Sequence, residues 1–193
     1  MGVIKTALEI ALEKTEMVKS DKSGIEQFEI RQRGKKLANT FLAGGVELTD
    51  ALKKTPKDQK ESLKQGIFDI LVTQITLPAA KEDKDRVERA GKGLAVVIDN
   101  NHFSAMFKQL MQVVDRYLQE ASHYEQAVRQ QYAPRLRKKE EELSRRLGRD
   151  VRIDPMQDPE FIAFYNQHIT ALKANYEPFF EQAKAEAQRL FKG

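Results

Sequence analysis

The segment Glu120-Ala121-Ser122-His123 has the Glu-x-x-His spacing that di-iron four-helix bundles use to bind metal ions. Such a site needs a second element of this kind and glutamates from two further helices. The nearest analogue, from Asp99 to His102, offers an aspartate at a helix boundary. The apolar stripe of the segment runs through neighbouring positions, which leaves Glu120 and His123 on its flanks. The pattern therefore favours an exposed polar pair, and we expect no metal ion.

The remaining candidates for catalysis are equally sparse. His168 lies within an apolar stripe, where a histidine is more often a core residue hydrogen-bonded to a tyrosine or a carbonyl than a base. The run from Arg89 to Gly93 lacks the glycine, lysine and serine or threonine spacing of a phosphate-binding loop. The chain has no cysteine, which excludes thiolate nucleophiles, thiolate metal sites and disulfides. We therefore expect a non-enzymatic protein without a cofactor.

The positive charge of the chain is concentrated between residues 135 and 152. This segment carries a net charge of +4, equal to that of the whole protein, and the rest of the chain is balanced. Exposed basic side chains at the turn of a helical hairpin could bind the phosphates of nucleic acid or of an anionic lipid surface. The alternative is a solvated helix surface with ion pairs such as Glu141 to Arg145. The candidate contacts are Arg135, Arg137, Lys138, Lys139, Arg145, Arg146, Arg149 and Arg152.

Large apolar side chains crowd the beginning of the last predicted helix. The segment expected to lie opposite offers mainly Leu136, Leu143 and Leu147. Such a surface is covered by a second copy of the chain, by a different protein, or by the short helices folding back over it. The sequence leaves these alternatives open. The first two predict a homodimer or a protein partner that contacts Phe161, Ile162, Phe164, Tyr165 and Ile169.

A long helical hairpin is expected to position both groups of residues. Residues 101–147 contain no break signal except Pro134, and their apolar residues follow a heptad spacing typical of a coiled coil. Gly148 ends this helix, and Asp158-Pro159 has the form of a helix start. Because Pro178 interrupts the second helix near the level of Pro134, we expect both helices to bend. The heptad positions are Phe103, Phe107, Leu110, Val114, Tyr117, Ala121, Tyr124 and Val128.

The N-terminal half reads as a bundle of shorter helices. An apolar stripe predicts a helix over residues 3–18, and Ser23-Gly24-Ile25-Glu26 has the form of a capping box that opens a second helix. Gly44-Gly45 ends the second helix, and a short helix over residues 49–54 follows. Thr55-Pro56 predicts the start of a further helix that closes at Pro78.

Residues 83–98 are compatible with a helix or a strand. The run from Leu94 to Ile98 is rich in β-branched residues, as in a buried strand. The spacing of Val87, Gly91, Leu94 and Ile98 favours a helix. The two alternatives stay open at this point.

The predicted helices make the fold class all-α, and the composition predicts that the protein folds. Hydrophobic residues make up 40% and charged residues 32% of the 193. We expect residues 1–99 to form the short-helix bundle and residues 100–193 the hairpin packed on it, as one cooperative unit. Charges interrupt the first apolar stretch and no apolar run of about 18 residues exists, so we expect a cytoplasmic protein without a membrane span. The favoured function is that of a structural or interaction protein; the alternative is binding of nucleic acid or an anionic surface through the hairpin tip.

Overall fold

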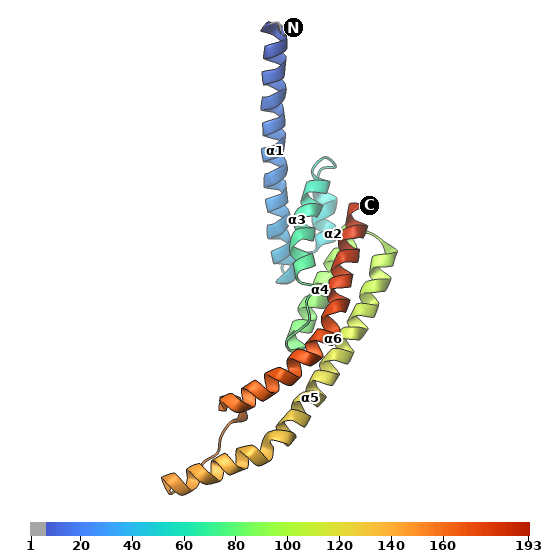
Figure 1. Cartoon of the computed structure of the whole chain (residues 1–193). Helices are drawn as coiled ribbons and strands as arrows, with labels where there is room; N and C mark the ends of the chain where they lie inside the picture. The colour runs from blue at the N-terminus through green and yellow to red at the C-terminus, as the bar shows by residue number, and fades with distance from the viewer. Residues whose placement is uncertain (1–6) are drawn as a thin grey trace, which may run out of the picture. The chain divides into compact units, whose positions relative to one another are not determined.

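The computed structural model describes the backbone of residues 7–193 and the side chains of residues 24–193. Within this range the protein is all-α, with no strand, so the predicted fold class is confirmed and residues 83–98 are helical (Figure 1). The elements are α1 (Ala7–Leu42), α2 (Leu48–Lys54), α3 (Lys60–Thr73), α4 (Lys81–Ile98), α5 (Asn101–Leu147), the 3-10 turn η1 (Pro155–Gln157) and α6 (Pro159–Lys192).

The chain divides into two compact units. The first unit contains the residues up to Gln74 together with 89–100, and the second contains 75–88 together with 101–193. Helix α4 therefore gives its first turns to the second unit and the remainder to the first. The second unit holds the whole hairpin of α5 and α6. Cooperative folding of the two parts stays a prediction.

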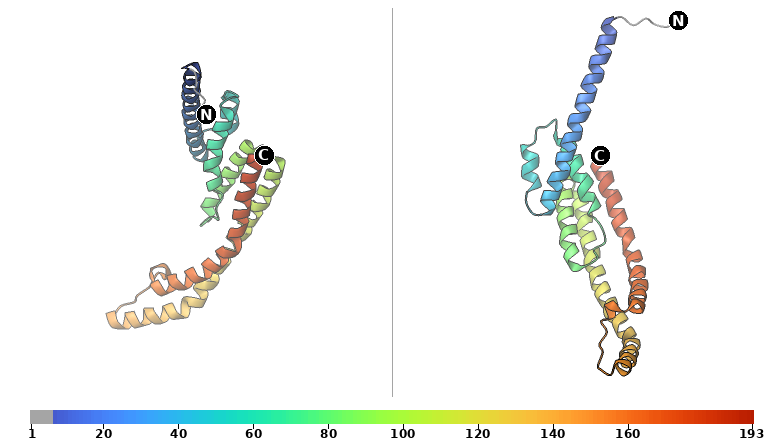
Figure 2. Two further views of the ribbon diagram at one scale, coloured as in Figure 1. Left: turned by 45° about the horizontal axis from the view of Figure 1, so that its top comes forward. Right: turned by 90° about the vertical axis from the view of Figure 1, so that its left-hand side faces the viewer.

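Helices α1 and α3 of the first unit cross very closely at two glycines (Figures 1 and 2). A Cβ atom on Gly66 would overlap the carbonyl oxygen of Arg31, and one on Gly34 would overlap the carbonyl oxygen of Leu63. Beside this crossing, Arg31 forms an ion pair with Asp69 at 2.7 Å. The two glycines thus allow backbone-to-backbone packing, and the ion pair joins the same two helices.

The N-terminal part of the first unit differs from the prediction, because α1 is one helix and not two. The predicted break at Ser23-Gly24 lies inside it. A glycine within a helix costs only about 1 kcal/mol relative to alanine, and no proline interrupts residues 7–42. The Ser23 side chain, on which the predicted capping box depends, lies outside the described side chains, and residues 3–6 lie outside the described backbone.

The start of α3 also differs from the prediction. Thr55 does not open a helix: its hydroxyl donates a hydrogen bond back to the carbonyl oxygen of Ala51 at 2.8 Å, so it ends α2. A threonine hydroxyl can bond to backbone groups before or after it in the chain, so its residue type alone does not show whether it ends one helix or begins the next. Residues 56–59 form a turn, α3 begins at Lys60, and it ends at Thr73, well before Pro78.

Helices α5 and α6 form the antiparallel hairpin of the second unit. Helix α5 has the predicted bounds, and Gly148 ends it with a φ of 64°, in the left-handed region. Six of the eight predicted heptad positions are buried, while Ala121 is half-buried and Tyr124 is exposed. Midway along the hairpin the Tyr117 and Tyr176 rings meet edge to face, with centroids 5.2 Å apart. The heptad spacing therefore identified most of the buried face of α5.

Pro134 and Pro178 both lie inside their helices without ending them. Figures 1 and 2 show α5 and α6 curving along their length. The role of the two prolines in this curvature stays a prediction.

The glycine crossing predicts a position-specific effect of adding a methyl group. Gly66→Ala should destabilise the protein by about 1–3 kcal/mol, because the carbonyl of Arg31 must move to admit the Cβ atom. Urea unfolding followed by circular dichroism would measure this. Gly24→Ala is the matched control: its Cβ meets no atom within 4 Å, so it should leave stability unchanged or raise it by up to ~1 kcal/mol. Equal effects of the two substitutions would contradict the close crossing.

Candidate binding surface at the hairpin tip

The hairpin tip, residues 132–160, comprises the end of α5, the connecting loop with η1, and the start of α6. The loop turns back along α5 and is held by side chains of that helix. The backbone N–H of Val151 donates to the Ser144 hydroxyl at 3.0 Å, and that of Ile153 donates to the Glu140 carboxylate at 2.9 Å. As a result, α6 begins beside residues 132–139 of α5 and not beside its last residue.

A cluster of polar side chains, the clasp, joins the two helices at this level. The ammonium of Lys139 on α5 donates to both carboxylate oxygens of Asp158, at 2.9 and 2.8 Å. The Tyr132 hydroxyl donates to the same carboxylate at 2.9 Å. Asp158 also caps α6 by accepting from the N–H of Glu160, whose own carboxylate lies 3.0 Å from Lys139. One buried aspartate thus connects both helices and the loop.

The clasp shifts the ionisation of its members in the directions expected for a charged pair. The hydrogen bond to Asp158 raises the pKa of Lys139 well above its usual range. Burial raises the pKa of Asp158, but hydrogen bonds from Lys139, Tyr132 and the Glu160 N–H together lower it below its ordinary value. Burial first, and then the hydrogen bond to Asp158, raises the pKa of Tyr132. Lysine and aspartate are therefore both charged, and the tyrosine is neutral, near pH 7.

The residues predicted to mediate self-association lie next to the clasp, and most of their surface is covered by the hairpin itself. Phe161 is fully buried against Val128 and Tyr132, with ring centroids 5.3 Å apart in the tyrosine pair. Of the residues predicted to lie opposite, Leu136 packs against this cluster, together with the earlier α5 residues Val128 and Tyr132, while Leu147 is exposed. Ile169 is also buried, while Ile162, Phe164 and Tyr165 are half-buried.

Seven of the eight predicted basic contacts are exposed. Lys139 is the exception, because it belongs to the clasp. Arg145 lies 3.9 Å from Glu141, and Arg152 lies 4.0 Å from Glu140, so these two make only long ion pairs from largely exposed side chains. Of the eight predicted contacts, five make no ion pair among the described side chains: Arg135, Arg137, Lys138, Arg146 and Arg149. The tip therefore presents several unpaired positive charges.

Apolar side chains are also exposed at the tip, while its tyrosine is not. Leu147 at the end of α5 is 55% exposed, and Met156 in η1 is 47% exposed. Tyr132 is 2% exposed and cannot stack on a base. The tip thus combines unpaired cations with exposed aliphatic side chains.

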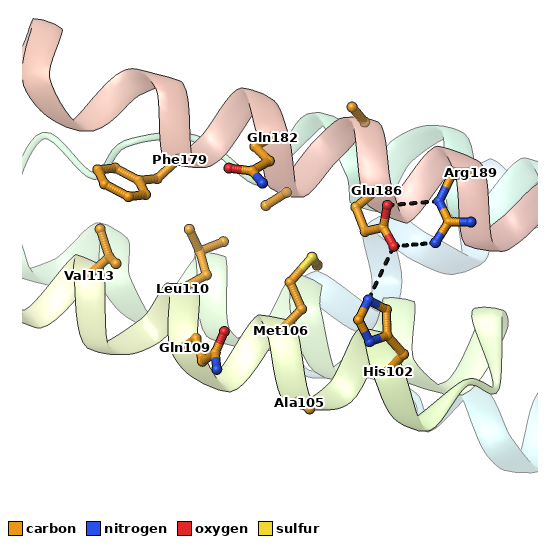
Figure 3. A pocket seen from close by; sticks show the side chains of 12 residues that line it. His102, Ala105, Met106, Gln109, Leu110, Val113, Phe179, Gln182, Glu186 and Arg189 are labelled. Atoms are coloured by element: carbon orange, nitrogen blue, oxygen red, sulfur yellow. Dashed lines mark hydrogen bonds and ion pairs between the residues drawn. The ribbon is translucent and has the colours of Figure 1, made fainter.

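A groove runs between α5 and α6 toward the other end of the hairpin, with a volume of about 780 Å³ (Figure 3). Its walls are mainly apolar and include Met106, Val113 and Phe179. At its polar end Glu186 accepts two hydrogen bonds from Arg189, at 2.6 and 2.9 Å, which lower the pKa of the glutamate. Since this carboxylate already neutralises the guanidinium, the groove offers an apolar surface and not an anion site.

The residues considered first for metal binding, Glu120 and His123, belong to no metal-binding group among the described residues. Within the described part of the chain, no three histidine, aspartate or glutamate side chains gather closely enough to hold a metal ion. Glu120 is engaged by Tyr176, whose pKa is raised by burial and then by its hydrogen bond to this glutamate. His123 is exposed. His168 is half-buried and packs edge-on against the Phe164 ring, at 4.6 Å between centroids, a ring contact that the sequence did not predict.

The clasp predicts a stability difference between two substitutions of Asp158. Asp158→Asn should cost about 1–2 kcal/mol at pH 7, because it removes the charge while asparagine still caps the helix. Asp158→Ala should cost about 1 kcal/mol more, since the cap is lost as well. Urea unfolding of the two variants and the native protein measures both steps. Equal stabilities of the three proteins would show that the clasp contributes nothing.

The clasp also predicts a dependence on pH. Because folding lowers the pKa of Asp158, its contribution is complete above the ordinary value of 3.8 and is lost as the pH falls below it. The stability difference between the native protein and Asp158→Asn should therefore shrink below about pH 4. A difference that is constant from neutral to acid pH would exclude the charge of Asp158 as its source.

The comparisons with known proteins concern the region that contains this tip. A family model described as "Family of unknown function (DUF6657)" matches residues 49–189, from α2 into α6. No curated protein and no solved structure matches the chain. Among the described residues, no helix has the length and apolar character needed to cross a membrane. Since the match covers well over half of the sequence and all of the tip, the chain belongs to the family of unknown function DUF6657.

Proposed function

We propose that this chain is a non-enzymatic, cytoplasmic interaction protein that binds an anionic partner through the hairpin tip. The observation that carries the proposal is the set of exposed basic side chains without ion pairs, on a tip whose loop is held by Ser144 and Glu140. The alternative is a solvated helix surface that binds no partner, and the retention experiment below separates the two.

The clasp supports the proposal because it organises the tip before a partner arrives. Ordering a flexible loop on binding reduces affinity, whereas a loop already held by hydrogen bonds avoids most of this cost. Here Ser144 and Glu140 hold the loop, and Asp158 holds the start of α6. The backbone that carries the exposed cations is therefore already ordered by these contacts.

The proposal predicts stronger retention of the native protein on an immobilised polyanion such as heparin than of a tip variant. Arg145→Ala with Arg146→Ala removes two exposed cations and should lower the salt concentration needed for elution, because fewer counterions are released on binding. Lys53→Ala with Lys54→Ala is the matched control, since both lysines are exposed on α2 and the net charge changes equally. Identical elution of the two variants would mean that net charge, and not the tip, determines retention.

A second candidate is self-association into a homodimer. The observation that favours it is the remaining exposed surface of Ile162, Phe164 and Tyr165 on α6. Apolar contact of this kind depends little on salt, in contrast to binding through the cations.

Self-association predicts a solution mass of two chains by light scattering, at both low and high salt. Ile162→Lys should shift the mass toward the monomer, because it places a charge in the contact. Leu147→Ser, an exposed apolar position outside this surface, should leave the mass unchanged. A monomeric native protein at high concentration would exclude this candidate and leave the first untouched.

A further inference from the structure

A pocket of about 720 Å³ lies beside the middle of the hairpin. It is formed by α5, α6 and the start of α4, and all of its lining residues belong to the second unit. Pockets that bind small molecules are commonly of this size. The lining shares no residue with the hairpin tip or with the groove of Figure 3, so the pocket is a separate site.

Two tyrosine hydroxyls at this pocket make no hydrogen bond to any described residue. Tyr117 on α5 is only 2% exposed, and Tyr165 on α6 is half-buried. Among the described residues, no wholly buried polar side-chain atom lacks a partner, so the Tyr117 hydroxyl keeps an opening to the pocket that it lines. A buried hydroxyl without an acceptor is unfavourable, and a ligand that supplies an acceptor removes this cost.

The other buried tyrosines of the hairpin have partners for their hydroxyls. Tyr132 donates to Asp158 at 2.9 Å, and Tyr176 forms a hydrogen bond with Glu120. The tyrosine donors that the folded hairpin leaves unused in its interior are therefore those at the pocket.

The Tyr117 hydroxyl lies near Lys173 along the hairpin. Leu172, the residue before Lys173, packs against Tyr117. After burial, Tyr165 and then Glu177 raise the pKa of Tyr117, so its hydroxyl lies near both of these residues of α6. Lys173 stands between them in the sequence and lines the same pocket, whereas Glu177 is exposed and is not part of the lining. A hydroxyl donor and an ammonium group thus serve the same part of the pocket.

The unpaired charges of the pocket are positive. Two lysines in its lining, the exposed Lys81 and the half-buried Lys173, make no ion pair with any described residue. The carboxylates in the lining are already engaged, and the pairs are Asp115 with Lys84 and Glu125 with Arg129. A negatively charged ligand is therefore complementary to the pocket, and a cation is not.

The remaining lining offers an apolar surface beside these donors. Ile169 on α6 is buried and Leu118 on α5 is half-buried. Tyr165, Ile169 and Lys173 follow one another at intervals of four residues, so they lie along one face of α6 over about 12 Å. An apolar body on Ile169 can thus extend from the ammonium of Lys173 toward the second tyrosine.

From these observations we infer that the pocket binds a small organic anion. Its carboxylate or phosphate accepts a hydrogen bond from Tyr117 and pairs with Lys173, and its apolar body lies on Leu118 and Ile169 toward Tyr165. The inference goes beyond the proposed function, because the pocket and the hairpin tip have no residue in common.

Fluorescence titration of the full chain with anilinonaphthalene sulfonate tests the inference. This probe joins an apolar body to one anionic group, and its emission rises when it leaves water. Phenylacetate and phenyl phosphate should displace it, and the stronger competitor shows whether the site prefers a carboxylate or a phosphate. Phenylethanol, a similar body without charge, should compete at least about ten-fold more weakly, since it lacks the charged acceptor. Equal displacement by the alcohol would overturn the assignment of an anion site.

Tyr117→Phe separates a ligand contact from a structural role. Because the hydroxyl makes no hydrogen bond within the fold, its removal should leave the midpoint of urea unfolding unchanged or raise it. Probe affinity should fall about ten-fold, the loss expected for one hydrogen bond to a charged group. Tyr124→Phe is the matched control, since Tyr124 is exposed on the same helix and does not line the pocket. A lower urea midpoint with unchanged probe affinity would make the hydroxyl a structural group and overturn the inference.

Lys173→Met tests the cation of the site. It should also weaken probe binding about ten-fold. Lys53→Met removes the same charge from the exposed surface of α2 and should bind the probe as the native protein does. Probe binding that neither Tyr117→Phe nor Lys173→Met weakens would have to occur elsewhere, such as the groove of Figure 3, and would overturn the inference.

The tip variant keeps the pocket and the proposed function distinguishable. Arg145→Ala with Arg146→Ala should lose retention on heparin while its probe affinity stays native, because neither arginine lines the pocket. Lys173→Met should show the reverse pattern. A loss of probe affinity in the tip variant would contradict the separation of the two sites.

Discussion

The position of α6 against α5 depends on one ion pair, between Lys139 and Asp158. This pair fixes where the second helix of the hairpin begins. Helix α6 starts beside Tyr132. Phe161 then follows Asp158 by one turn and lies on the tyrosine ring. Had α6 begun at the very end of α5, the aromatic cluster would face Leu143 and Leu147 and would remain uncovered.

Asp158 performs two tasks that are usually divided between residues. It caps α6 through its interaction with the Glu160 N–H, and it forms the charged contact with α5. Burial of a carboxylate is unfavourable unless hydrogen bonds replace the lost water, and here three donors do so. Because the cap and the ion pair share one side chain, formation of the first turn of α6 and closure of the hairpin tip are coupled events.

The sequence predicted long-range features of the hairpin better than its local details. Helix α5 was predictable because nothing but Pro134 interrupts it before Gly148, and α6 because Asp158-Pro159 is a strong start signal. Thr55 misled because a threonine hydroxyl bonds backward as readily as forward. The clasp and the register of α6 along α5 were not predictable, since both require the loop to fold back onto Ser144 and Glu140. These are contacts between loop backbone and side chains, and no periodicity in the sequence encodes them.

The clasp also explains why a simple charge count misjudges the tip. Residues 135–160 contain eight basic and seven acidic side chains, which is nearly balanced. Asp158 and Glu160 are engaged by Lys139, and Glu140 accepts from the loop backbone, so three carboxylates and one cation are committed inside the tip. The outward surface keeps seven cations against four carboxylates. The interactions that stabilise the hairpin therefore also create its positive surface, and any substitution that opens the clasp should weaken anion binding without removing a single exposed cation.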